Sequence, residues 1–350
     1  MTNNKPYISL VVAGRNDNYN GDFTQRLQLS ISWLSFLVQK HQLPFELVLV
    51  NYNPIPDQPD LGELLDWPED NTYLSIKIVD VPASFHKKYH DPEIRKSVPL
   101  YEFIAKNIGI VRTKGEFILC TNADILLSEA LFIFLATRPL KKGHVYRCDR
   151  VDFSPVTEKV NFKELESYIR KNVHLFMMKG GFIPTLSKPR ALNTRLSLLR
   201  MFNKIRLYYY RTFLYLPIIR SLPFFTRVDA KLLFTFTYHC QASGDFCLMH
   251  RSDWGKIKGY LEDTWTNVHV DSLCLVAAVT AGVQQIELPY PVYHQDHQKR
   301  FDYDGYSVEN RMGKRFLSDV NKMLKTGKPI VNDSENWGLK NEKLSERIMD

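Results

Sequence analysis

The chain has 350 residues, 44% of them hydrophobic and 24% charged, with a formal net charge of +8 at pH 7. This length and composition predict a globular protein of one large domain or two modest ones. The positive charge favours anionic partners such as nucleotides, acidic glycans or phospholipid head groups. The five cysteines form no C-x-x-C pair, which argues against a zinc site or a disulfide framework and favours a reducing, cytoplasmic compartment.

The first third of the sequence alternates between predicted strands and helices. Residues 1–6 are polar and lack a signal-peptide pattern. Apolar runs and helical periodicity then predict a strand at 7–13, a helix at 23–41, a strand at 45–51, a short helix at 61–65 and a strand at 74–79. The loop after the first strand is not G-x-G-x-x-G, so no dinucleotide-binding fingerprint is present. The alternation predicts a mostly parallel sheet.

The stretch 117–127 is the centre of the predicted site. It follows an irregular polar stretch at 86–99 and a helix at 100–111, and it reads apolar, polar, then apolar again. This pattern predicts a buried strand that ends by exposing Asp124 at the sheet edge, where ligands bind in open α/β sheets. A carboxylate there could hold Mn²⁺ or Mg²⁺ against a diphosphate. The alternative is that Asp124 only caps a helix at 128–137.

The second half begins with an extended piece at 145–153 and then changes character. Residues 156–239 are rich in basic and aromatic residues and poor in acids, which predicts a helical insertion. Regular α/β order returns at 242–249, with a helix at 270–281, a strand at 285–288 and a polar, partly helical tail after residue 297. The expected fold is therefore α/β, with a mostly parallel central sheet, flanking helices and this insertion.

The basic insertion has two interpretations that the sequence leaves open. Its helices could pack on the sheet domain with a wet basic face, or they could dock on an anionic membrane surface, where aromatic and basic side chains are favoured. The most apolar run, 207–225, contains Arg211 and Arg220 and is no membrane span. Nucleic-acid binding is not expected, because no reader module is present. We expect a cytoplasmic protein, peripheral on the inner face of the cell membrane.

Several different short motifs occur once each at separate places along the chain. They are Lys106-Asn107-Ile108-Gly109, Gly115-Glu116-Phe117, Asn122-Ala123-Asp124, Gly244-Asp245-Phe246, His269-Val270-Asp271, Tyr293-His294-Gln295-Asp296-His297 and Asn336-Trp337-Gly338-Leu339. This set resembles the GT-A glycosyltransferases, specifically family-2-like bacterial enzymes of surface polysaccharide synthesis. The resemblance covers residues 7–155 and 240–300. It implies a nucleotide-sugar-binding half at 1–155, an acceptor and catalytic half at 240–300 and a tail at 301–350 that packs on the domain.

The resemblance also implies a metal site. Asp124 would hold the Mn²⁺ or Mg²⁺ that bridges the sugar-nucleotide phosphates, with His294 as the first choice for a further ligand and His297 as the second. The family's Asp-x-Asp element is incomplete here, because Asn122 stands at its first position. One carboxylate with phosphates and waters can still hold such a cation. Imidazole suits Mn²⁺ better than Mg²⁺.

The remaining site residues are assigned by the same resemblance. Asp271 would be the general base that takes the proton of the acceptor hydroxyl in an inverting enzyme; its alternative is an N-cap or first-turn acid of the helix at 270–281. Asp245 competes for that role, in the Gly244 loop where the acceptor or the donor sugar would bind. The donor nucleotide would be bound by Ala13, Gly14, Arg15, Asn51, Asp80, Lys106 and Asn107.

The function implied is transfer of a sugar from a nucleotide-diphosphate sugar, with UDP-sugars favoured, to a glycan or lipid-linked acceptor. Two alternatives stay open. A sugar-phosphate nucleotidyltransferase would carry a Gly-rich basic loop after the first strand, and Gly14-Arg15-Asn16-Asp17 is not such a loop. A non-catalytic module would keep the fold and bind a nucleotide or glycan without turnover. Asn122, in place of the first Asp of the Asp-x-Asp element, is the feature that leaves this alternative possible.

Overall fold

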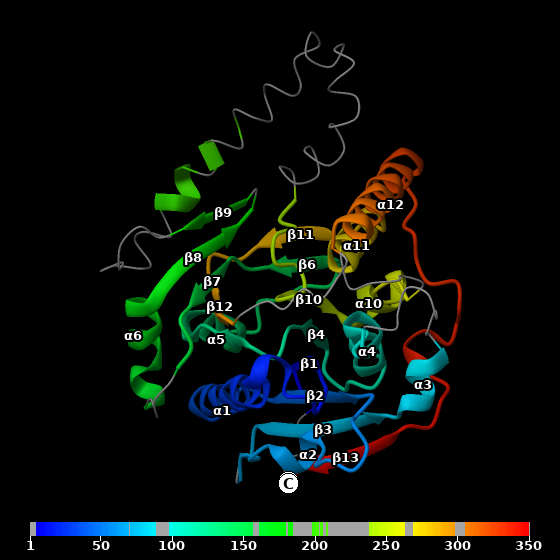
Figure 1. Ribbon diagram of the computed structural model, residues 1–350. Helices are drawn as coiled ribbons and strands as arrows, with labels where there is room; N and C mark the ends of the chain where they lie inside the picture. The colour runs from blue at the N-terminus through cyan, green and yellow to red at the C-terminus, as the bar shows by residue number, and fades with distance from the viewer. Residues whose placement is uncertain are drawn as a thin grey trace.

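The computed structural model of the chain is a mixed α/β structure (Figure 1). It describes residues 5–69, 71–88, 98–156, 161–179, 181–184, 198–202, 204–205, 208, 238–262, 269–297 and 305–349, with the backbone alone at 181–184 and 305–313. No helix in these ranges has the length and apolar character of a membrane span.

An eight-stranded sheet forms the centre of the molecule, in the order β11-β6-β10-β4-β1-β2-β3-β13. Its parallel part comprises β1 (Ile8–Gly14), β2 (Phe45–Tyr52), β3 (Leu74–Val81) and β4 (Phe117–Cys120). The other strands are β6 (His144–Arg147), β10 (Cys247–His250), β11 (Gln284–Glu287) and β13 (Ser345–Met349). Strand β10 is antiparallel to β4 and β6, and β13 to β3. The expected α/β fold with a mostly parallel central sheet is therefore confirmed.

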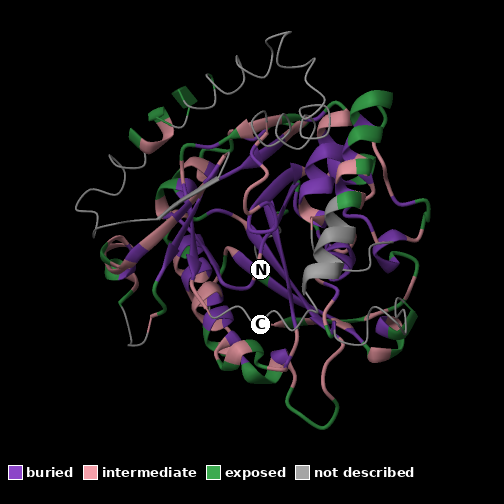
Figure 2. Ribbon diagram, turned by 45° about the horizontal axis from the view of Figure 1, so that its top comes forward, coloured by how far each residue is buried: buried purple, intermediate pink, exposed green. Residues whose placement is uncertain are grey.

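Helices cover both faces of this sheet because its strands are apolar on both sides (Figures 1 and 2). On β1, Leu10 and Val12 face one core and Val11 faces the other, as the two-residue period of a strand requires. The first core is covered by α1 (Phe23–His41), α5 (Glu129–Ala136) and α6 (Phe162–Asn172). The second is covered by α4 (Glu102–Ile110), α10 (Arg251–Ile257) and α11 (Val270–Thr280).

The remaining elements lie around this body. Helices α2 (Leu61–Leu64) and α3 (Ala83–Lys88) follow β2 and β3. Helix α12 (Gly305–Thr326) packs on α11 through a small apolar cluster that includes Leu273, Val320 and Met323. The 3-10 turn η2 (Trp337–Leu339) packs on α4 before the chain ends in β13.

A second, five-stranded sheet has the order β5-β12-β7-β8-β9. Its strands are β5 (Ile125–Leu127), β7 (Arg150–Phe153), β8 (Val173–Met178), β9 (Gly181–Pro184) and β12 (Val292–Gln295). The chain passes from the first sheet to the second three times, between β4 and β5, between β6 and β7, and between β11 and β12. Residues 121–124 form the first of these passages, so the seam between the two sheets contains the predicted site.

Three local expectations need correction: the alternative role of Asp124, the continuity of the extended piece at 145–153, and the wholly helical insertion. Asp124 does not cap the helix after it: α5 begins after Ser128, whose hydroxyl accepts a hydrogen bond from the Leu131 amide. The extended piece at 145–153 is two strands in different sheets. The insertion is not wholly helical, because β8 and β9 follow α6; Val173 and Phe176 of β8 are buried in the core beside β7. The rest of the insertion lies largely outside the described residues, as do residues 89–97 of the predicted irregular stretch.

Candidate functional site

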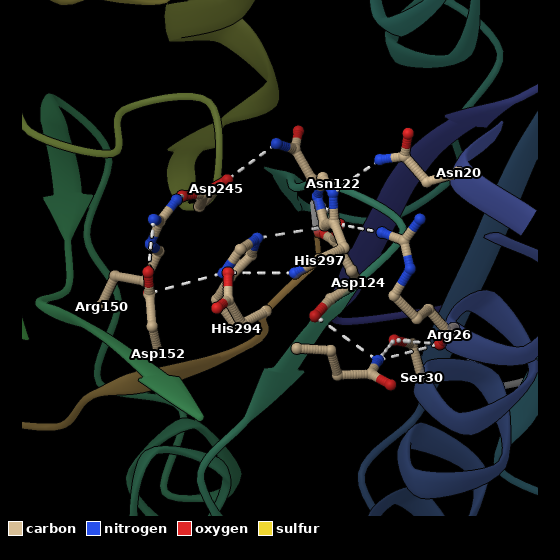
Figure 3. A network of polar contacts seen from close by, with 12 residues as sticks. Asn20, Arg26, Ser30, Asn122, Asp124, Arg150, Asp152, Asp245, His294 and His297 are labelled. Carbon is tan, nitrogen blue, oxygen red and sulfur yellow. Dashed lines mark hydrogen bonds and ion pairs between the residues drawn. The ribbon is translucent and has the colours of Figure 1, made fainter. Parts of the chain in front are cut away.

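The candidate site lies where the strand order of the central sheet reverses. The chain runs outward from β1 through β2 to β3, and then returns to the other side of β1 as β4. In open α/β sheets the crevice at such a switch point, beyond the carboxyl ends of the strands, binds ligands. Asn122 and Asp124 follow β4 directly, and Arg15 follows β1. Asn122 and Asp124 thus lie beyond the carboxyl end of β4, as expected (Figure 3). The expected exposure of Asp124 is wrong, because the residue is only 8% exposed and its carboxylate is covered by the side chains that pair with it.

Asp124 is surrounded by groups that carry or can carry positive charge. Its Oδ2 atom lies 2.8 Å from Arg26 Nη1, 3.2 Å from His297 Nε2 and 3.8 Å from His294 Nε2. Its Oδ1 atom is buried and has no hydrogen-bond partner among the described residues. Burial disfavours the ionised carboxylate, but His294, His297 and Arg26 together hold the pKa of Asp124 well below its usual range. The carboxylate is thus ionised and keeps an uncommitted oxygen.

The two histidines reach Asp124 from the end of β12. His294 lies in register with Ile125 of β5 on one side and with Asp152 of β7 on the other. The ligand atoms of Asp124, His294 and His297 all lie within 4.8 Å of one another. Two imidazole nitrogens and a carboxylate oxygen form a donor set that favours Mn²⁺ and later transition metals over Mg²⁺. With Oδ1 of Asp124 unpaired, these residues fit a divalent cation.

Behind His294 stands a second carboxylate that sequence analysis did not identify. Asp152 Oδ1 lies 3.5 Å from His294 Nδ1, and Arg150 holds Asp152 with two hydrogen bonds of 2.7 and 2.8 Å. At 3.5 Å this is an ion-pair contact and not a hydrogen bond, since His294 Nδ1 has no hydrogen-bond partner among the described residues. A carboxylate in this position can orient a metal-binding histidine from its far nitrogen. Burial alone would lower the pKa of His294, but Asp124 and Asp152 raise it above the usual value.

Arg150 extends this network to the acceptor half predicted from sequence. Its Nη1 atom donates to Asp245 Oδ2 at 2.7 Å, and Asp245 Oδ1 accepts from Asn122 Nδ2 at 2.7 Å. Asn122 Oδ1 in turn accepts from Lys106 Nζ at 2.6 Å, and the same ammonium donates to the Gly244 carbonyl at 3.0 Å. Lys106 is fully buried. The structure therefore brings together four residues from three of the motifs: Lys106, Asn122, Gly244 and Asp245.

Asp271 lies in the first turn of α11 and faces the same loop. The N-cap of this helix is His269, so the N-cap reading of Asp271 is wrong, whereas its position as a first-turn acid is confirmed. Its Oδ2 atom accepts from the Gly244 amide at 2.9 Å and from the Ser243 hydroxyl at 2.7 Å. The carboxylate thus holds the loop one residue before Asp245.

The predicted nucleotide-binding residues are more widely spaced than the residues of the network around Asp124 and Asp245. Arg15 donates to the Asn53 carbonyl at 2.6 Å. Asn51 donates to Asp80 at 2.9 Å. Ala13 and Gly14 end β1, and a Cβ on Gly14 would lie 2.8 Å from the Phe23 ring, so this glycine packs closely against α1.

Two of the predicted residues have partners far from Asp124 in the fold. Asp80 is paired with Arg347 of β13 at the edge of the sheet, at 2.8 and 2.9 Å. Asn107 donates to the Tyr260 carbonyl at 2.8 Å and to Glu262 at 2.9 Å. These contacts tie β3 and α4 to later parts of the chain, and neither residue joins the network around Asp124 and Asp245.

Comparison with known proteins adds no family to these observations. Neither a scan against protein-family models nor a search of curated proteins finds a match to the chain. What the site can do must therefore be argued from its own geometry and chemistry.

Proposed function

We propose that the chain is a GT-A-like glycosyltransferase that moves a sugar from a nucleotide-diphosphate sugar to a hydroxyl of a glycan or lipid-linked acceptor. The observation that carries the proposal is the convergence of Asp124, His294 and His297 at the switch point of the sheet. The order β3-β2-β1-β4 matches the part of a doubly wound sheet that comprises one mononucleotide-binding half and the first strand beyond the switch point. A divalent cation bound there would neutralise charge that builds on a diphosphate leaving group.

The chain's own residues supply a positive and a negative side to the site. Arg26 and Lys106 are buried cations beside Asp124 and Asn122, where a diphosphate would add negative charge. Asp245 and Asp271 lie beyond them on the Gly244 loop and α11. The two sides suit a donor phosphate and an acceptor hydroxyl, respectively.

Asp271 is the better candidate for the general base. Asp245 is nearly fully buried, with Arg150 on one carboxylate oxygen and Asn122 on the other. Asp271 is only partly buried, and its partners are a hydroxyl and backbone amides. A base must reach the hydroxyl whose proton it takes, and accessibility favours Asp271. A single base acting on the acceptor makes inversion at the anomeric carbon the expected outcome.

The proposal is tested by nucleotide release from a panel of UDP- and GDP-sugars with and without Mn²⁺. We expect release from one class of donor, dependent on the metal and abolished by Asp124→Ala in a protein that melts normally. Asp22→Ala is the matched control, because Asp22 also pairs with Arg26, at 3.1 Å, but lies outside the set of possible ligands. That variant should keep its activity.

The same assay separates the alternatives. A non-catalytic module would bind a nucleotide sugar without releasing the nucleotide. A nucleotidyltransferase would instead release pyrophosphate from a nucleoside triphosphate and a sugar phosphate. Either result, or full activity of the Asp124→Ala variant, would refute the assignment.

A further inference from the structure

A second group of possible metal ligands lies on the side of His294 that faces away from Asp124. Among the residues that the structure describes, an oxygen of Asp152, an oxygen of Asp296 and a ring nitrogen of His174 lie within 4.8 Å of one another. Asp152 faces Nδ1 of His294, whereas Asp124 faces Nε2 (Figure 3). The two groups of ligands are therefore separate and meet at one imidazole.

Neighbouring strands of the second sheet bring the three side chains together. Asp152 is on β7, which lies between β12 and β8. Asp296 directly follows β12, and its amide donates to the Phe153 carbonyl at 2.9 Å, so the pairing of β12 with β7 continues to this residue. His174 is on β8, the other neighbour of β7. The hydrogen bonds of the sheet thus fix where the three ligands lie.

His174 is the extra residue of a β-bulge. Val173 pairs with Phe153 and Leu175 pairs with Asp152, so His174 has no residue opposite it on β7. A bulge changes the direction in which a side chain points, and bulges are frequent beside functional sites. Here His174 Nε2 lies 3.2 Å from Asp296 Oδ2. The bulge thus adds an imidazole to the two carboxylates.

Asp152 is the fixed member of the group. It is only 3% exposed, and Arg150 donates to both of its oxygens. Carboxylates that bind a metal are commonly held by hydrogen bonds of this kind, and a carboxylate has about four acceptor positions, so two such bonds leave it able to bind a cation. The side chains of His174 and Asp296 are 40% and 44% exposed. A cation can therefore enter from solvent and keep water as its remaining ligands.

We propose that Asp152, His174 and Asp296 form a second site for a divalent cation, either Mn²⁺ or Zn²⁺. One imidazole with two carboxylates suits these metals better than Mg²⁺ or Ca²⁺, which prefer oxygen ligands alone. The alternative is a simple surface ion pair between His174 and Asp296. Such a pair does not require the buried third ligand that Asp152 adds. The inference goes beyond the proposed function and does not depend on sugar transfer.

The number of Mn²⁺ ions bound by the full chain, measured by electron paramagnetic resonance with Mn²⁺ alone, tests this proposal. We expect two ions on the wild type and one on His174→Ala, which changes a partly exposed residue outside the group of Asp124, His294 and His297. His41→Ala is the matched control. His41 also pairs with a carboxylate, Glu129 at 3.0 Å, but belongs to no such group among the described residues. It should still bind two ions.

Two further variants make the outcome specific. Asp296→Asn should lose the same ion as His174→Ala, and Asp124→Ala should lose the other one. The second site is overturned if His174→Ala binds as many ions as the wild type, or if the wild type binds a single ion that only Asp124→Ala loses. A single ion that His174→Ala loses and Asp124→Ala keeps would support the second site and contradict the metal site of the proposed function.

Discussion

Substitution Asn122→Asp would create an Asp-x-Asp sequence at residues 122–124, yet we expect it to damage the site. Lys106 can only donate hydrogen bonds, and the ionised Asp245 can only accept them. Asn122 lies between the two, accepting from Lys106 at 2.6 Å and donating to Asp245 at 2.7 Å. A neutral amide meets both demands at any pH, whereas a carboxyl group meets them only while it is protonated. The asparagine therefore suits its neighbours at neutral pH.

The expected loss of stability in the Asn122→Asp variant follows from opposing electrostatic contributions. At an effective dielectric constant of about 20, a carboxylate at residue 122 would gain about 6 kcal/mol from Lys106 and lose about the same to Asp245. The lost hydrogen bond to a buried carboxylate, about 1.5–3 kcal/mol, and the burial of a further charge are then uncompensated. We expect a net loss of about 2–4 kcal/mol, equivalent to a melting temperature lower by about 3–5 °C for a chain of 350 residues.

Thermal melts at pH 5 and pH 8 provide the assay. Two carboxyls that share a site raise one pKa in the folded protein, so the pair is stable when it holds a proton and loses stability as the pH rises through that pKa. The Asn122→Asp variant should therefore be more destabilised at pH 8 than at pH 5. Asn341→Asp, at an exposed asparagine, should change little at either pH. Wild-type stability at both pH values, together with tighter Mn²⁺ binding, would refute the reasoning.

Three further outcomes are expected. Asp152→Asn should weaken Mn²⁺ binding about 10–100-fold in calorimetry; unchanged affinity would remove Asp152 from its role behind His294. Gly338→Ala should lower the melting temperature, because φ is +64° and a Cβ would lie 2.6 Å from the Asn107 carbonyl oxygen, whereas Gly255→Ala, with nothing within 4 Å, should not. The raised pKa of His294 should stabilise the metal-free protein below pH 6.5 and less as the pH rises, and His294→Gln should flatten this dependence.

The first part of the fold could be predicted because its signals are local. Helix α1 spans Phe23–His41 as expected, since its apolar residues recur at helical spacing and Gln42 ends it in a left-handed conformation. Strands β1 and β2 are buried along their whole length and read as continuous apolar runs. Strand β13 was missed because its residues are mostly exposed, and its pairing with β3 joins distant parts of the chain.

The candidate site was predictable only where a motif marked it. Asp124, His294 and His297 lie in motifs of the resemblance, and the structure brings them together. Arg150 and Asp152 were missed because alternating charge along a strand normally indicates a solvated face. Here every residue of β7 is buried, since β7 lies inside the second sheet and its polar side chains pair with one another and with Asp245.

The contact between Arg26 and Asp124 could not be predicted from the sequence for a different reason. It lies on α1 among residues with ordinary helical periodicity, and nothing in that pattern indicates that its guanidinium reaches Asp124 across 98 positions of sequence. The contact depends on the packing of α1 beside the passage between β4 and β5, which is a tertiary property. Long-range ion pairs of this kind have no local sequence signal.

Binding of UDP with and without Mn²⁺, measured by calorimetry on the wild type and on Asp124→Ala, tests the central claim most directly. The claim is that Asp124, His294 and His297 hold the cation against which a nucleotide diphosphate binds. We expect UDP to bind the wild type in the presence of Mn²⁺ and much more weakly without it, and the variant to lose the metal-dependent part. Equal affinity with and without Mn²⁺, or full metal-dependent binding in the variant, would contradict the account.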